Sequence, residues 1–218
     1  TYIGEITSYS QTIFQAHNII LLFSSLTYFE GTDTINKTVK NNLDMMMKIY
    51  HFSHNDCDAL IVLTDFDQIS LRGEAYDKSV CTKYGLGLVD IGKNVSYNPF
   101  LVAISLCHEL SHMMGFNHFK KFLHGPDDTQ RRRCSCHDLD ETYCLMYSVA
   151  SYTLKSHPPH LDDCNMNTQL PILQLKKCLI NRNKINIKGN IKKSAVHIKQ
   201  KCFCSSKNIC HNTIIEYG

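Results

Sequence analysis

Short apolar runs separated by polar segments predict strands that alternate with helices. Residues 19–29 are apolar and alternate in the way of a buried strand, and residues 59–64 and 85–90 predict two further short strands. Strands and helices in alternation are typical of an α/β domain, which we place at residues 1–181.

Apolar residues at helical spacing predict two helices between and after these strands. The first has Asp33 or Thr34 as its N-cap and runs to about Phe52. The second covers residues 99–114, with a proline suited to its first turn. It ends at Gly115, which can adopt the left-handed conformation of a helix C-cap.

The second half of the chain is more polar. Residues 119–143 are polar and basic and predict a long surface loop, and a last helix is predicted at residues 167–180 with Pro171 near its start. Residues 182–218 are rich in Lys and Asn and then in Cys, so we expect a linker and the beginning of a cysteine-rich module.

Composition narrows the class of protein. The chain has 218 residues, 43% of them hydrophobic and 20% charged, which is ordinary for a globular protein. A net charge of +3 gives no electrostatic support for a nucleic-acid partner, and no apolar run reaches the ~18 residues of a membrane span. Eleven cysteines and twelve histidines are unusual, and they indicate an oxidising compartment, metal binding, or both.

The strongest candidate for chemistry is the sequence HELSHMMGFNH at residues 108–118. On a helix, His108 and His112 project from one face, so both imidazoles can reach one metal ion. The chain can turn at the glycine and bring His118 to the same ion. Glu109 is placed to deprotonate a metal-bound water, and three histidines leave a fourth zinc position open for it. Chance surface histidines would not be expected to hold these fixed positions.

This sequence resembles the metzincin metalloproteases, whose pattern is H-E-x-x-H-x-x-G-x-x-H followed by a methionine turn. Cys144-Leu145-Met146-Tyr147 matches that turn, which implies that Met146 lies beneath the three histidines. The resemblance implies the metzincin fold, with a twisted mixed β-sheet, an active-site helix and a small C-terminal subdomain.

The order of the cysteines is similar to that of the reprolysin branch, which comprises ADAM proteins and snake-venom metalloproteases. The match begins near residue 12, and we expect that the first strand and part of the first helix of the family's domain are missing. The resemblance implies a substrate peptide bound extended along an edge strand near residues 71–73. It also implies three disulfides: Cys81–Cys178, Cys134–Cys164 and Cys136–Cys144.

Some cysteines remain open to other interpretations. A second zinc site is the alternative to the disulfides, although paired CxxC spacing is absent. Cys57 and Cys107 lie outside the implied pairing, and they are either bridged to each other or unpaired. The family often binds a structural calcium, and its ligands would be Asp56, Asn181 and the carbonyl of Cys178.

Two positions depart from the family pattern, namely Ser111, where glycine is usual, and Phe119, where aspartate is usual. Neither is a ligand or the base. The sequence therefore predicts a zinc-dependent endopeptidase acting on extracellular or cell-surface proteins, secreted or on the outer side of the plasma membrane. The alternative is an ADAM-like adhesion or recognition protein with little protease activity. Cell-surface partners would bind through the disintegrin-like region expected after residue 182.

Overall fold

The computed structural model describes residues 2–23, 58–64, 73–92, 98–118, 134–136, 144–147, 159–179 and 196–200. The predicted helix that would end near Phe52 and the greater part of the predicted loop at residues 119–143 lie outside these ranges. The helices and strands are α1 (Tyr2–Gln15), β1 (Ile19–Phe23), β2 (Leu60–Thr64), β3 (Gly73–Ala75), β4 (Leu86–Asp90), α3 (Pro99–Met114), α5 (Asp163–Leu175) and β5 (Val196–Gln200).

The central sheet is mixed, as predicted. Its strand order is β2-β4-β3, with β2 parallel and β3 antiparallel to β4. All five residues of β4 are buried, because this strand has neighbours on both sides and α3 packs against it. The short strand β3 forms one edge of this sheet, close to the position expected from the resemblance.

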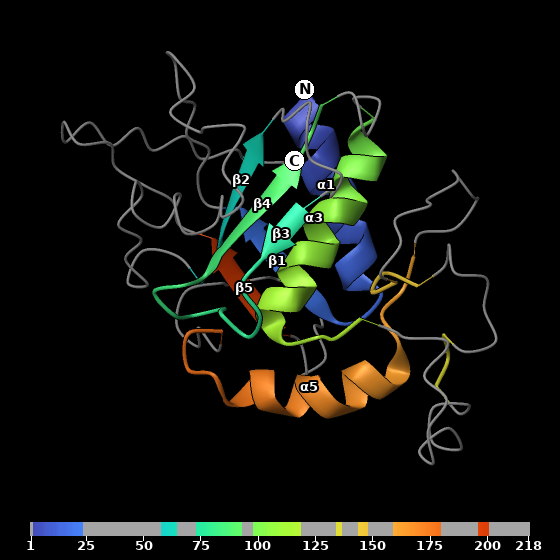
Figure 1. Cartoon of the computed structure of the whole chain (residues 1–218). Coiled ribbons are helices and arrows are strands. Elements are labelled where there is room, and N and C mark those ends of the chain that lie inside the picture. The colour runs from blue at the N-terminus through green and yellow to red at the C-terminus, as the bar shows by residue number, and fades with distance from the viewer. Residues whose placement is uncertain are drawn as a thin grey trace, which may run out of the picture.

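Helix α3 has the bounds that the sequence predicts, because both of its caps are local. The Asn98 side chain accepts hydrogen bonds from the backbone of Phe100 and Leu101, and Pro99 occupies the first turn. At the other end, Gly115 has a φ of 98° and its N–H donates to the His112 carbonyl. The helix lies alongside the sheet, and α5 crosses near its C-terminal end (Figure 1).

Helix α1 was not predicted, because its apolar positions are sparse and its other face is rich in Ser, Thr and Gln. It buries Ile6, Ser10, Ile13 and Phe14 against α3. The small Ser10 faces the helix contact, where its carbonyl accepts a hydrogen bond from the Cys107 thiol at 3.7 Å. Cys107 is a buried free thiol rather than half of a disulfide, and burial raises its pKa. Its predicted alternative partner, Cys57, lies outside the described residues.

A second, two-stranded sheet joins distant parts of the sequence. Strand β1 covers the first half of the predicted strand at residues 19–29, and it pairs in parallel with β5. Strand β5 lies within residues 182–218, which the sequence predicts to be a linker and the start of a second module. Part of that segment therefore pairs with a strand of the α/β domain.

The last helix begins and ends earlier than predicted. Asp162 is its N-cap, since the carboxylate accepts from the backbone of Cys164 and Asn165, and the helix ends at Leu175. Pro171 therefore lies inside the helix and not near its start, which corrects the prediction of 167–180. The same carboxylate accepts from the backbone of Cys136 at 3.0 Å and so connects α5 to the preceding segment.

Six cysteines form three disulfides in the structure, and these are the pairs that the resemblance implied. The Cα atoms of each pair are 5.4–6.1 Å apart, within the usual range. The bridge between Cys81 and Cys178 joins the segment after β3 to the segment after α5. Among the described residues, no helix is both long and apolar enough to cross a membrane.

His17 connects the end of α1 to the segment that precedes α5. Its Nε2 accepts a hydrogen bond from the backbone N–H of Leu161 at 2.9 Å, and its ring stacks on that of His160. Burial, followed by the neighbouring His160, lowers the pKa of His17 from its ordinary value of 6.5 to about 4. The neutral ring is therefore the form that the fold stabilises.

We predict that the His17 contact makes the fold sensitive to acid. Because the folded pKa is lowered, its stabilisation is complete above pH 6.5 and is lost as the pH falls through about 4. The free energy of unfolding should fall by an amount on the order of 2 kcal/mol, a figure that is reduced because His17 is partly exposed. Denaturant unfolding of the wild type and His17→Gln at pH 7, 5.5 and 4.5 checks this. Glutamine can accept the same hydrogen bond without titrating, so the variant should lose less stability, and parallel losses would contradict the prediction.

Candidate metal centre

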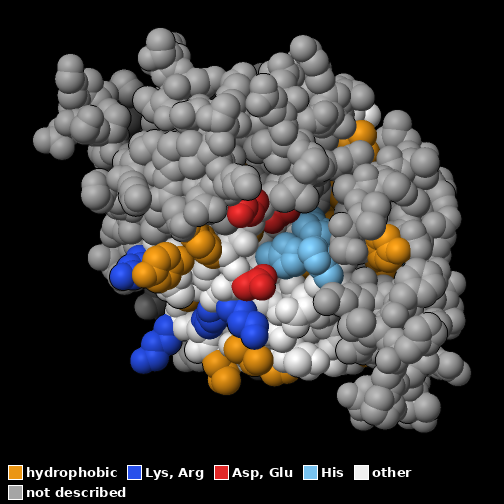
Figure 2. All heavy atoms as spheres, in the orientation of Figure 1, with side chains coloured by type: hydrophobic (Ala, Val, Ile, Leu, Met, Phe, Trp, Pro, Cys, Tyr) orange, Lys and Arg blue, Asp and Glu red, His pale blue; other side chains and the backbone are white. Residues whose placement is uncertain are grey.

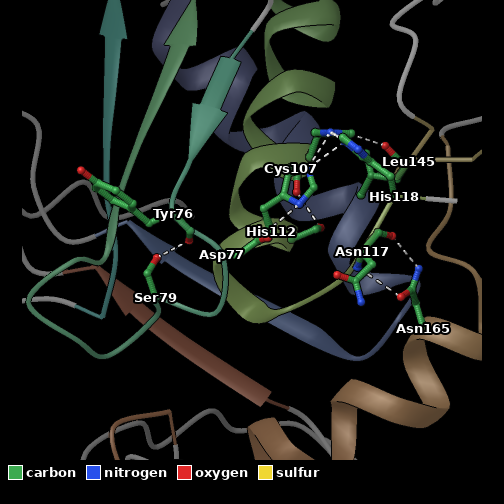
Figure 3. A network of polar contacts seen from close by, with 11 residues as sticks. Tyr76, Asp77, Ser79, Cys107, His112, Asn117, His118, Leu145 and Asn165 are labelled. Carbon is green, nitrogen blue, oxygen red and sulfur yellow. Dashed lines mark hydrogen bonds and ion pairs between the residues drawn. The ribbon is translucent and has the colours of Figure 1, made fainter. Parts of the chain in front are cut away.

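Three histidines from the end of α3 and the following segment converge on one point. His108 and His112 lie one turn apart on α3, and the turn at Gly115 brings His118 back towards them. Their Nε2 atoms are 2.9–3.1 Å from one another. Figure 2 shows this cluster at the molecular surface with acidic side chains beside it, and the close view shows how His112 and His118 face one another (Figure 3).

The hydrogen bonds of the other ring nitrogens fix the tautomers. Nδ1 of His108 lies 2.6 Å from the carbonyl oxygen of Leu145, and a carbonyl can only accept, so Nδ1 carries the hydrogen. Nδ1 of His112 lies 3.2 Å from the Asp77 carboxylate, and the carbonyl of Phe116 also accepts from this ring. In the neutral rings, the Nε2 atoms of His108 and His112 therefore present lone pairs.

These lone pairs explain why the cluster fits a metal ion. The lone pairs of His108 and His112, whose Nε2 atoms are 3.1 Å apart, repel one another and cannot form a hydrogen bond with each other, whereas a cation beside them is attracted to both. A triangle with sides of 2.9–3.1 Å has a point at about 2.0–2.1 Å from each corner, which is the usual zinc–nitrogen distance. The potential ligand atoms of the three histidines all lie within 4.8 Å of one another, which is close enough to share one metal ion.

The surroundings favour neutral imidazoles, which is the form that binds metals. Burial, together with the neighbouring His112 and His118, lowers the pKa of His108 to about 4 against the opposing effect of the hydrogen bond to the Leu145 carbonyl. Burial also lowers the pKa of His112, although Asp77 partly opposes this. The rings therefore need not lose a proton to bind a metal at neutral pH.

Glu109 is almost fully buried, with 6% of its surface exposed. Burial, together with the smaller effects of the Glu74 and Asp77 carboxylates, raises its pKa to about 8. Its side chain lies against the start of β3, where Gly73 leaves room for it: a Cβ atom at Gly73 would be 2.6 Å from Oε1 of Glu109. A carboxylate with a raised pKa beside a metal site is suited to proton transfer.

Helix α5 holds the segment that carries His118. The side-chain amide of Asn165 donates to the Asn117 carbonyl at 3.0 Å, and its oxygen accepts from the Asn117 backbone N–H at 3.3 Å (Figure 3). One turn further along α5, the side chain of Gln169 lies against Gly115, where a Cβ atom would be 2.9 Å from its oxygen. Two turns of α5 therefore support the return of the chain after α3.

The predicted methionine turn lies next to His108. Met146 is buried, and the turn is closed by a hydrogen bond from the Tyr147 backbone to the Cys144 carbonyl. The backbone of Leu145 bonds on both sides: its N–H donates to the His160 carbonyl, and its own carbonyl accepts from His108. The turn thereby orients the first histidine.

The calcium site expected from the resemblance has no support among the described residues. Asp56 and Asn181 lie outside them, so the Cys178 carbonyl is the one expected ligand that the structure describes. Of the two departures from the family pattern, Phe119 also lies outside. Ser111 is fully buried, and its hydroxyl donates to the Cys107 carbonyl one turn back along α3.

Sequence reasoning placed Gly73 at the expected edge strand, but it did not identify the contacts by which three residues shape this site. Each of these residues acts through a contact with a residue 35 to 48 positions away in the sequence, and none belongs to the histidine motif. They are Gly73, Asp77 and Asn165. The single local sign that one of them lies near the site was the position of Asp77, just after the expected edge strand. Local pattern alone does not show which distant side chain such a residue contacts.

Comparison with known proteins agrees with this geometry. The model of the reprolysin (M12B) family zinc metalloproteases matches residues 1–183. The chain is 24% identical to the zinc metalloproteinase-disintegrin-like atrase-A of Naja atra, over 98% of this chain and 33% of that protein. It is 30% identical to the snake venom metalloproteinase trimerelysin-2 of Protobothrops flavoviridis, over 59% of this chain and 54% of that protein. The chain thus spans about a third to a half of these relatives.

We predict that Asn165→Ala weakens zinc binding. The change removes two hydrogen bonds that hold the segment before His118, so this ligand should occupy its position less often. Competition with a chromophoric chelator should show a zinc dissociation constant roughly 10-fold higher. Asn167→Ala, at an exposed position of the same helix, is the matched control and should bind zinc as the wild type does. Equal affinities in the two variants would refute the role of Asn165.

Proposed function

Because the chain belongs to the reprolysin (M12B) family of zinc metalloproteases, we propose that it is an endopeptidase in which Glu109 is the general base. The observation that carries this proposal is the convergence of three Nε2 atoms within 2.9–3.1 Å, one residue along α3 from a buried carboxylate. His108, His112 and His118 would hold zinc, and Met146 would lie beneath them. When bound, zinc supplies a Lewis acid that polarises a carbonyl and lowers the pKa of a water.

In this proposal, Glu109 moves the proton. It accepts a proton from the attacking water and returns it to the nitrogen of the departing amine, so that both halves of the peptide bond leave neutral. Burial supports this role, since a carboxylate with a raised pKa holds a proton long enough to deliver it. The positive charge of a bound metal would oppose part of that rise and bring the pKa nearer to neutral.

The substrate would be a protein or peptide bound in extended form along β3. This strand is at the edge of the described sheet, and its first residue lies against Glu109. Backbone hydrogen bonds between a peptide and such an edge align the scissile bond without depending on sequence. The intact histidines and the base favour an enzyme over the adhesion protein that was the alternative.

We also propose that the protein works outside the cell. Three disulfides in one small domain are typical of oxidising compartments. The segment after residue 182 is proposed to lead into a disintegrin-like region with cell-surface partners, because a relative described as disintegrin-like matches 98% of the chain.

The central test is Glu109→Gln. This isosteric change removes the proton acceptor, so peptidase activity on casein should fall by roughly 10²–10⁴-fold while zinc is retained. A chelator should abolish the activity of the wild type, and added zinc should restore it. Glu5→Gln, an exposed site on α1, is the control and should remain active. Undiminished activity in Glu109→Gln, or activity that survives the chelator, would exclude the proposed mechanism.

A second prediction concerns the space in front of Glu109. In Gly73→Ala the new methyl would lie 2.6 Å from both Cγ and Oε1 of Glu109, so the side chain must move away. We expect kcat to fall at least about 10-fold, with a smaller change in zinc affinity, because a displacement near 1 Å is costly for proton transfer. Steady-state kinetics and a zinc titration on the same preparation measure both quantities. An unchanged kcat would show that the position of this carboxylate is not critical.

A further inference from the structure

The two histidines of α3 differ in what holds their outer nitrogens. Nδ1 of His108 is held by a neutral backbone carbonyl, that of Leu145. The ring of His112 also contacts a charged side chain, because its Nδ1 lies 3.2 Å from the Asp77 carboxylate. In the close view, Asp77 approaches the ring of His112 from the side opposite to His118 (Figure 3). A carboxylate is thus in place behind one ligand of the metal site.

The backbone holds Asp77 in this position. In the turn after β3, the N–H of Lys78 donates to the carbonyl of His112 itself, and the N–H of Val80 donates to that of Met113. The Ser79 hydroxyl closes the turn by donating to the Tyr76 carbonyl at 2.6 Å (Figure 3). The residue after Asp77 is therefore bonded to the same residue whose ring Asp77 contacts, so the carboxylate and the imidazole are held together at two points.

We propose that Asp77 is a positioning residue of the metal site, and this rests on the proposed function of the three histidines. Its carboxylate accepts the Nδ1 hydrogen of His112 and so keeps the Nε2 lone pair directed at the metal. The negative charge also increases electron density on the ring, which strengthens Nε2 as a ligand. Partners of this kind, one step removed from the metal, typically contribute 10–100-fold to metal affinity.

Simple ion pairing does not account for the contact. The Asp77 side chain is 65% exposed, and an exposed pair contributes little to stability. The Phe116 carbonyl also accepts from His112, so the hydrogen at Nδ1 does not depend on Asp77 alone. What Asp77 adds is a charged second acceptor that restricts rotation of the ring. Its removal should therefore alter metal binding more than folding.

The test uses Zn²⁺ alone, titrated in competition with a chromophoric chelator, on the wild type, Asp77→Ala and Asp77→Asn. We expect the zinc dissociation constant to rise about 10-fold or more in Asp77→Ala and by less in Asp77→Asn, whose amide oxygen still accepts. Thermal unfolding of each variant verifies that it folds. If Asp77→Ala does not fold, Asp77→Asn carries the test, and an affinity equal to that of the wild type overturns the proposal.

Glu74→Gln is the matched control. Glu74 is exposed on β3 and, like Asp77, raises the pKa of Glu109, so its removal makes a similar change in charge near the base. Zinc affinity near that of the wild type in Glu74→Gln supports positioning by Asp77, and an equal loss in both variants overturns it. Casein hydrolysis is measured in parallel. A wild type without peptidase activity would contradict the proposed function, whereas the zinc affinities alone decide the role of Asp77.

Discussion

The close approach of three imidazole Nε2 atoms, 2.9–3.1 Å apart, is the constraint on which the rest of the structure depends. The lone pairs of His108 and His112 repel one another, so these rings would separate if they were free to turn. Each part of the surrounding fold opposes that separation. The Leu145 carbonyl holds His108, the segment after β3 holds His112, and Asn165 holds the chain next to His118. A cation then meets three ring nitrogens that the protein already holds together.

This support comes from separate elements, and covalent bonds join them. The bridge between Cys81 and Cys178 connects the segment that carries Asp77 to the segment after α5, while the bridge at Cys164 ties the first turn of α5 to Cys134. In this metzincin fold, α3 carries two of the three clustered histidines and the buried Glu109. The rest of the domain fixes their orientation, which a helix alone cannot do.

The features that the sequence predicts well are those set by near neighbours. Helix α3 could be placed to the residue because Asn98, Pro99 and Gly115 act within one turn of its ends. The histidine motif has the same local character. Helix α1 was missed because Ser10 is buried there, and a polar residue at a buried position disguises the helical pattern. The start of α5 was missed because Pro171 was placed in the first turn, whereas the helix begins earlier, at the Asp162 cap. Asp77 and Asn165 could not be found because their partners are distant in sequence.

The nesting of the three disulfides has a consequence for biosynthesis. The bridge between Cys136 and Cys144 lies within the loop closed by Cys134 and Cys164, and both lie within the loop closed by Cys81 and Cys178. As the chain leaves the ribosome, Cys81 emerges first of the six, and its partner follows 97 residues later. Five other thiols, that of Cys107 among them, pass in the meantime. An early bond from Cys81 to any of them would be non-native, and it would have to be reopened by disulfide exchange before the native pairs could form.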